Sequence, residues 1–163
     1  CEGSTFWFEI PLEIASAPSG HAENVEVVLE RSHQATEAHR FQPLTILLAD
    51  DNPVNQKIAV TLLKNIGYQV DAVFSGVAAL AALETKKYDL ILMDVQMPEM
   101  DGLEATRAIR QSKKDYCNIH IIAMTANAMK EDEEKCLNAG MNNYLSKPIQ
   151  RQKLLNAIEN SQK

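Results

Sequence analysis

From Leu44 onward, short strand-like segments alternate five times with longer segments whose apolar residues recur at helical spacing. The run of residues 90–93 (LILM) is predicted to form a strand covered by helices on both faces, because apolar residues occupy both of its alternating sides. Strands that are joined through helices by short connections pair in parallel, with right-handed crossovers. The sequence therefore predicts one doubly wound α/β domain, a five-stranded parallel sheet with helices on both faces.

Proline and glycine help to place the boundaries of these elements. Pro53 is favoured in the first turn of a helix and Gly67 can end one, so the first helix is expected between them. The other expected helices cover residues 76–85, 103–112, 128–139 and 149–160. The expected strands cover residues 44–49, 69–74, 89–93, 119–124 and 143–146. Each predicted strand is thus followed by a helix, with the longest connection (residues 94–102) after the third strand.

Polar side chains stand where the predicted strands end. Asp50 and Asp51 follow the first strand, Asp94 the third, Thr125 the fourth and Lys147 the fifth. Asp94 alone could be a turn or cap residue, because aspartate is common in turns. Parallel strands bring their carboxyl ends to the same edge of a sheet, where ligands bind in folds of this class. The five residues together therefore indicate a functional site at that edge.

The chemistry of this group points to phosphoryl transfer. Clustered carboxylates such as Asp51 and Asp94 repel one another unless a cation lies among them, and oxygen ligands at a partly open site suit Mg²⁺. Such a metal can also hold the oxygens of an incoming phosphoryl group, and a carboxylate nucleophile then forms an acyl phosphate. Lys147 and Thr125 supply a cation and a hydroxyl for the transferred group. Spacing and chemistry together predict aspartyl-phosphate formation at Asp94.

Four phrases of the sequence fit this picture in order. They are residues 46–51 (ILLADD), 93–102 (MDVQMPEMDG), 123–128 (AMTANA) and 147–149 (KPI). Through them, residues 44–160 resemble the receiver domains of two-component signalling. The resemblance implies a receiver domain over residues 43–161 with the flavodoxin-like strand order 2-1-3-4-5.

The resemblance also implies a role for each site residue. Asp94 would be the phospho-acceptor, Lys147 the phosphate-binding lysine, Thr125 the switch hydroxyl and Tyr144 the switch aromatic. Mg²⁺ would be held by Asp50, Asp51 and Asp94 and by the backbone carbonyl of Gln96, with Asp51 a direct ligand. The Lys147–Pro148 peptide bond would be cis, which proline makes accessible.

The N-terminal stretch has a different character. Phe6, Phe8 and Ile10 alternate with other residues at the spacing of a strand. The phrases GSTFWF and IPL within residues 1–14 resemble the end of the ATP-binding domain of sensor histidine kinases, so a C-terminal remnant of that domain is expected there. Polar residues 15–42 are expected to form an interdomain linker. We expect no ATP binding by this fragment, because the nucleotide motifs and the phosphorylatable histidine of such kinases would lie upstream.

Composition excludes several classes of function. The net charge of −6 argues against nucleic-acid binding, which needs a basic face. Three cysteines without a CxxC pair indicate reduced thiols rather than a disulfide framework or a zinc site. No apolar run approaches the roughly 20 residues that span a bilayer. A cytoplasmic location without direct membrane contact is therefore expected, although the parent chain could carry an anchor upstream.

These observations predict the receiver of a hybrid sensor histidine kinase, because too few residues follow the last helix for a DNA-binding segment. Its partners would be the kinase core of the same parent chain and a histidine phosphotransfer domain. The expected docking surface is the first helix together with the loops around Asp94. On that helix Asn55, Ile58, Ala59 and Leu62 lie at helical spacing, some of them facing the core.

Three alternatives remain at this point. The chain could be a receiver-like interaction module that does not transfer phosphate, or a stand-alone response regulator. A flavodoxin-like flavin carrier would share the strand order, but Asp50 and Asp51 would repel a cofactor phosphate after the first strand.

Overall fold

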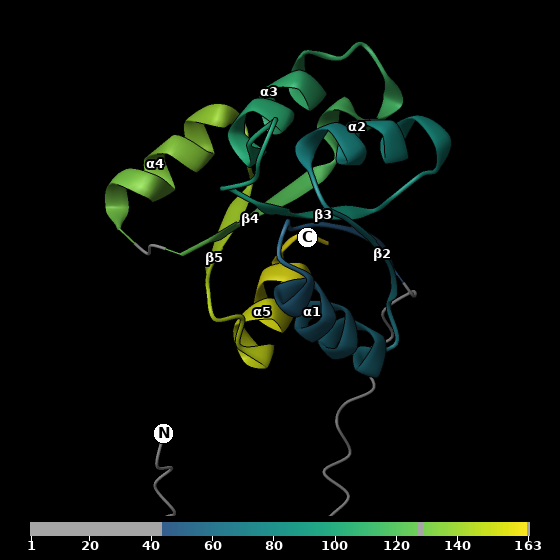
Figure 1. The fold of residues 1–163 in the computed structure, drawn as a ribbon, viewed down its shortest axis with the longest axis vertical. Coiled ribbons are helices and arrows are strands. Elements are labelled where there is room, and N and C mark those ends of the chain that lie inside the picture. Colours follow the sequence, from purple (N-terminus) through teal and green to yellow (C-terminus); the bar gives the residue numbers. More distant parts are fainter. Residues whose placement is uncertain (1–43, 127–128, 163) are drawn as a thin grey trace, which may run out of the picture. The chain divides into compact units, whose positions relative to one another are not determined.

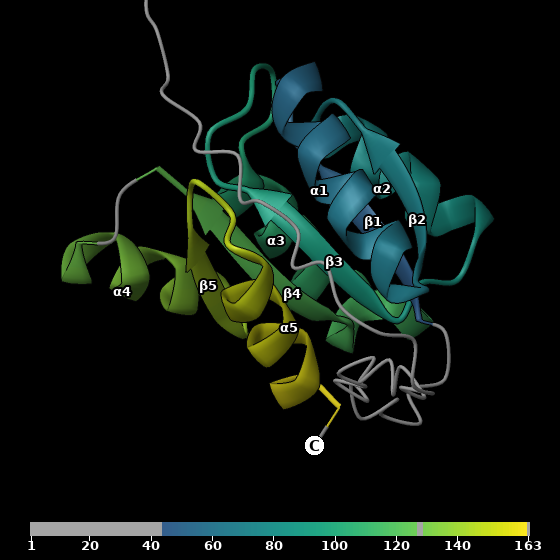
Figure 2. The same ribbon diagram turned by 90° about the horizontal axis from the view of Figure 1, so that it is seen from below.

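The computed structural model describes residues 44–126 and 129–162. Within them, the strands are β1 (Thr45–Ala49), β2 (Gln69–Val73), β3 (Leu90–Asp94), β4 (His120–Thr125) and β5 (Asn143–Ser146). The α-helices are α1 (Pro53–Ile66), α2 (Gly76–Thr85), α3 (Gly102–Gln111), α4 (Lys130–Ala139) and α5 (Arg151–Asn160). A 3₁₀ helix, η1 (Asp115–Asn118), precedes β4. All strands pair in parallel in the order β2-β1-β3-β4-β5 (Figures 1 and 2), which confirms the predicted fold class and strand order.

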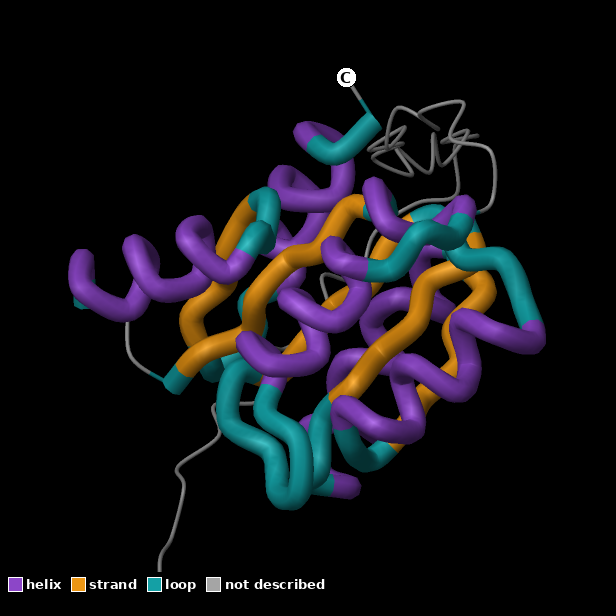
Figure 3. The backbone as a smooth tube through the Cα atoms, turned by 90° about the horizontal axis from the view of Figure 1, so that it is seen from above, coloured by secondary structure: helices purple, strands orange, loops and turns teal. Residues whose placement is uncertain are grey.

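The sheet separates two hydrophobic cores. Along β1, Ile46 and Leu48 belong to the core that is closed by α1 and α5. Leu47 and Ala49 belong to the core on the other face, under α2, α3 and α4. The strands accordingly lie between α2 and α3 on one side and α1 and α5 on the other (Figure 1), and helices overlie the strands when the sheet is seen from above (Figure 3). This arrangement explains why the central strands β1, β3 and β4 are apolar on both alternating sides, whereas β2 and β5 at the sheet margins carry polar residues.

Local signals fix the ends of α1 and α3. The side chain of Asn52 accepts a hydrogen bond of 2.9 Å from the backbone N–H of Val54, and so caps the start of α1. Gly67 ends α1 in the left-handed conformation, with a φ of 104°. Asp101 and Glu104 form a capping box at the start of α3. These caps set where the chain leaves the sheet edge after β1 and β3.

The structure moves several predicted boundaries. Asp94 and Thr125 are the last residues of β3 and β4 rather than the residues that follow them, whereas Phe74 lies beyond β2 and is 56% exposed. Helix α5 begins at Arg151, and the preceding Lys147–Pro148 bond is cis. Helix η1 was not predicted. The remnant expected over residues 1–14 and the linker over 15–42 lie outside the described residues, as does the predicted helix start at residue 128.

Among the helices of residues 44–126 and 129–162, none combines the length and the apolar character that crossing a bilayer requires.

Candidate functional site

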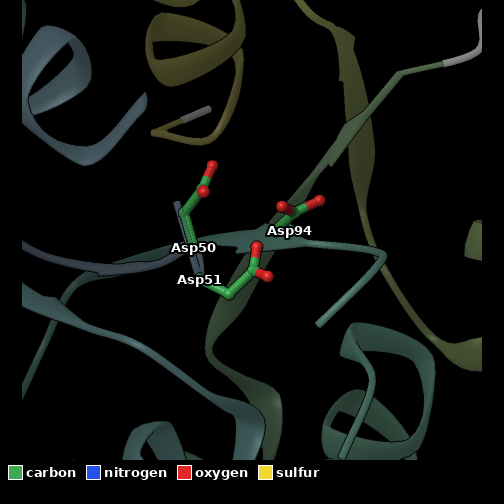
Figure 4. A group of neighbouring side chains, drawn as sticks. All are labelled: Asp50, Asp51 and Asp94. Carbon is green, nitrogen blue, oxygen red and sulfur yellow. The ribbon is translucent and has the colours of Figure 1, made fainter. Parts of the chain in front are cut away.

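The structure brings together the three acidic residues predicted at the strand ends. Asp50 follows β1 and is 1% exposed, Asp94 ends β3 and is 5% exposed, and Asp51 is exposed. One carboxylate oxygen from each lies within 4.8 Å of the others (Figure 4). Two buried acids and one exposed acid thus form a single group, called here the acid group, at the carboxyl edge of the sheet.

One lysine lies against the acid group. Lys147 follows β5, and its Nζ is 2.8 Å from Oδ2 of Asp50 and 2.5 Å from Oδ2 of Asp94. Burial alone would lower the pKa of Lys147, but its contacts with Asp50 and Asp94 raise that pKa overall. Burial raises the pKa of Asp94, and the hydrogen bond and charge of Lys147 offset only part of that rise. The single lysine therefore does not fully offset the burial of the Asp94 carboxylate.

Backbone donors orient the two buried carboxylates. Oδ1 of Asp50 accepts a hydrogen bond of 2.9 Å from the N–H of Asn52. Oδ1 of Asp94 accepts one of 3.2 Å from the N–H of Gln96. The metal-binding role of the Gln96 carbonyl remains a prediction.

The loop after β3 approaches the backbone of Asp94 so closely that only glycine fits at position 102. A Cβ atom on Gly102 would lie 2.1 Å from the carbonyl oxygen of Asp94. The N–H of Gly102 donates to the carbonyl of Val95 at 3.0 Å and closes this turn. Gly102 therefore lets α3 begin directly beside Asp94.

The two predicted switch residues lie on neighbouring strands. Thr125 is 7% exposed, and its carbonyl accepts a hydrogen bond of 2.7 Å from the N–H of Lys147. Tyr144 is half-buried and pairs in register with Ala123, which places it on the same face of the sheet as Thr125. A hydrogen bond and charge from Glu133 of α4 raise the pKa of the Tyr144 phenol.

Comparison with known proteins agrees with this geometry. The family model for the response regulator receiver domain matches residues 46–159. The chain belongs to this family.

Named relatives of this receiver domain include hybrid kinases. Hybrid signal transduction histidine kinase K of Dictyostelium discoideum is 36% identical over 167 residues, which cover 98% of this chain and 13% of that protein. The sensor histidine kinase GacS of Pseudomonas protegens is 44% identical over 115 residues, covering 69% of this chain and 12% of that protein. The receiver thus spans only a small part of the length of these relatives.

A solved structure resembles this receiver in both sequence and fold. It is the receiver domain of sensor histidine kinase PA1611 from Pseudomonas aeruginosa, described with a magnesium ion coordinated in its active-site cleft. The two are 44% identical, with a TM-score of 0.67, over 73% of this chain and 97% of that one.

The acid group of this receiver fits a hard divalent cation. Three carboxylates offer oxygen ligands close together, as Mg²⁺ prefers. Oδ2 of Asp50 is buried and lacks a hydrogen-bond donor, although Lys147 pairs with it by charge. Among the described residues, the side chain of Asp51 makes no hydrogen bond or ion pair. Ligand capacity is therefore left for a cation.

The expected docking residues divide between the surface and the core. Ile58 is 50% exposed on α1, and Asn55 and Leu62 are partly buried. Ala59 is 1% exposed, so it belongs to the core and not to a docking surface. Val54, which the sequence reasoning did not single out, is 63% exposed one turn before Ile58.

Sequence reasoning also missed Gln56. It is 7% exposed and shares the buried side of α1 with Ala59 and Leu63. The available signal was an amide at helical spacing from apolar residues, on the stripe that faces the sheet.

Proposed function

We propose that this receiver takes a phosphoryl group from a phosphohistidine onto Asp94, with Mg²⁺ as cofactor, and passes it to a histidine phosphotransfer domain. The observation that carries the proposal is the position of Asp94, which lies buried at the end of β3 between two further carboxylates and Lys147. A carboxylate there can act as nucleophile, while Lys147 and a cation held by the acids stabilise the negative charge of the transferred group.

The reaction follows from these residues. An oxygen of Asp94 attacks phosphorus, the bond from phosphorus to the imidazole nitrogen breaks, and that nitrogen keeps the electron pair. Mg²⁺ held by Asp50, Asp51, Asp94 and the Gln96 carbonyl would neutralise the carboxylates and the phosphoryl oxygens. Lys147 already contacts Asp94, so its ammonium can pair with the phosphoryl oxygens that arrive there. Thr125 supplies a hydroxyl at the neighbouring strand end.

Phosphorylation would be sensed by Thr125 and Tyr144. The Thr125 hydroxyl would move toward the phosphoryl group and Tyr144 would turn inward. Because Tyr144 lies on β5 beside α4, its movement would repack the surface formed by α4, β5 and α5. A local change of charge would thereby reach a distant surface.

The parent protein is proposed to be a hybrid sensor histidine kinase. Similarity to a hybrid kinase extends over 98% of this chain, beyond the receiver itself, and this supports a kinase remnant over residues 1–14 and a linker over residues 15–42. The partners would then be the kinase core of the same chain and a phosphotransfer domain in the cytoplasm. Val54 and Ile58, which are exposed on α1, provide a surface for that domain, with the partly buried Asn55 beside them.

Acetyl phosphate tests the acceptor role directly. We expect the protein to gain one phosphoryl group with Mg²⁺ present, and the Asp94→Asn variant to gain none, as measured by intact mass spectrometry. Chelation of the metal should abolish the adduct. If no adduct forms and beryllofluoride leaves the NMR signals of Thr125 and Tyr144 unchanged, the chain is a receiver-like interaction module instead.

Phosphotransfer tests the docking surface. The Ile58→Glu variant should lose transfer to or from a histidine phosphotransfer domain while still reacting with acetyl phosphate. Leu137→Glu is a matched control, because Leu137 is 48% exposed on α4 and Ile58 is 50% exposed on α1. Equal transfer by the two variants would place the docking surface elsewhere.

A further inference from the structure

Gln56 connects the buried side of α1 to the ends of two strands. Its side-chain Nε2 donates to the backbone carbonyl of Asp50 and to that of Val73, both at 2.8 Å. The register between β1 and β2 ends at Ala49 and Val73. The amide of Gln56 therefore adds hydrogen-bond donors at the point where the two strands separate.

The peptide held by Gln56 joins the two acids that follow β1. The carbonyl of Asp50 belongs to the peptide plane that leads into Asp51. The N–H of Asp50 in turn donates to the carbonyl of Val73 at 3.2 Å. Hydrogen bonds thus fix the backbone on both sides of the Asp50 α-carbon.

Asp51 depends on this backbone more than the other two acids do. The carboxylate of Asp50 is held by the N–H of Asn52 and by Lys147, and that of Asp94 by Lys147 and a backbone N–H. Within the described part of the chain, the Asp51 side chain has no hydrogen bond or ion pair. Its place in the acid group therefore comes from the direction in which its backbone leaves β1.

We infer that Gln56 is a positioning residue for the divalent-cation site, which acts by holding the Asp50–Asp51 peptide so that the Asp51 carboxylate meets those of Asp50 and Asp94. This inference rests on the proposed Mg²⁺-dependent function. Gln56 would thereby support the site through the backbone, as a residue that is not itself a ligand of the cation or of the phosphoryl group. Residues that orient metal ligands in this way affect metal affinity by about 10- to 100-fold when they are replaced.

The test compares Mg²⁺ affinity with stability in the Gln56→Met variant, which keeps the length of the side chain and removes both donors. Gln152→Met is the control, because Gln152 is an exposed helical glutamine on α5. We expect the Mg²⁺ dissociation constant, from an NMR titration, to rise about tenfold or more in Gln56→Met and to stay unchanged in Gln152→Met. Phosphorylation by acetyl phosphate at saturating Mg²⁺ should recover toward the wild-type rate.

Loss of stability with an unchanged dissociation constant would overturn the inference, because Gln56 would then serve only to hydrogen-bond the carbonyls at the ends of two strands. No Mg²⁺ binding by the wild-type protein would instead refute the proposed function on which the inference rests. If Gln56→Met does not fold, NMR measurements on the wild-type protein still test the inference. The side-chain NH₂ signals of Gln56 should exchange slowly with solvent and shift during the Mg²⁺ titration with the same midpoint as the Asp51 amide. Rapid exchange or an unaffected signal would contradict the inference.

Discussion

The acid group should make the receiver less stable than its Asp94→Asn variant when divalent cations are absent. Asp94 is 5% exposed and shares one lysine with Asp50. Asparagine has nearly the same shape and can keep the hydrogen bond that Asp94 accepts from the N–H of Gln96. The substitution therefore removes a buried charge with little change in packing.

Two opposing charge effects set the size of this change. The carboxylate oxygens lie within 4.8 Å of one another, and two unit charges at that limit repel by about 3.5 kcal/mol at an effective dielectric constant of about 20. Asp94 meets two such neighbours, and on the same scale its attraction to Lys147 at 2.5 Å is about 7 kcal/mol. These effects nearly cancel, so the desolvation of the carboxylate decides the sign. We expect Asp94→Asn to be more stable by about 1–2 kcal/mol at pH 7.

Urea unfolding in EDTA and in Mg²⁺ measures this difference. A cation at 100 times its dissociation constant stabilises the wild-type protein by about 2.7 kcal/mol. Added Mg²⁺ should therefore reverse the order of stability, since the variant lacks one ligand. Asp115→Asn serves as control, because Asp115 is exposed in η1 at the opposite edge of the sheet. The reasoning is refuted if Asp94→Asn is the less stable protein in EDTA.

The stability difference between Asp94→Asn and the wild-type protein should change with pH in a definite direction. Burial raises the pKa of Asp94 above its unfolded value, so folding favours the protonated carboxyl. The contribution of Asp94 to stability is then fully present below an unfolded pKa of about 3.9. It is lost as the pH rises through the folded pKa. The advantage of Asp94→Asn should therefore grow from about pH 4 upward and be absent below it.

Three further predictions follow from other contacts. Gly102→Ala should lose about 1–3 kcal/mol of unfolding free energy and react slowly with acetyl phosphate, because the new methyl would lie 2.1 Å from the Asp94 carbonyl oxygen; wild-type stability and rate would contradict this. Arg110→Met should lose about 2–3 kcal/mol in urea unfolding, since oxygens of η1 and of the α4–β5 connection lose their donors, yet it should still be phosphorylated. Tyr88 should titrate with a pKa of about 12 in ultraviolet absorbance, because it is partly buried and bonded to Asp71; an unchanged pKa in Asp71→Asn would exclude the contribution of that bond.

The sequence predicted the strands and helices well because burial on two faces leaves a plain pattern. Along β3, Leu90 and Leu92 belong to one core, and Ile91 and Met93 to the other. The sequence does not mark the strand ends as plainly, because a polar side chain does not stop the backbone hydrogen bonds between strands. Asp94 still pairs in register with Met124 and is therefore the last residue of β3, not the first residue after it.

The site was predictable to the extent that it depends on strand ends. The sheet topology alone brings Asp50, Asp94 and Lys147 to one edge. The position of Gln56 could not be predicted in the same way, because its role depends on where β1 and β2 separate and on the reach of one side chain. The burial of Ala59 was unpredictable for a similar reason. Helical spacing places Ile58 and Ala59 on the same helix but does not show which of the two faces the sheet.

The acids of the group are held unequally, and this difference has a consequence for cation binding. Asp50 and Asp94 are buried and share Lys147, so a cation must compete with its ammonium group for their Oδ2 atoms. Asp51 is exposed and, among the described residues, without a polar partner, so its carboxylate is available at once. An incoming cation should therefore meet Asp51 first and displace Lys147 afterwards. On this reasoning Asp51→Asn should slow cation association, whereas replacing Lys147 by methionine should strengthen cation binding and still impair phosphorylation.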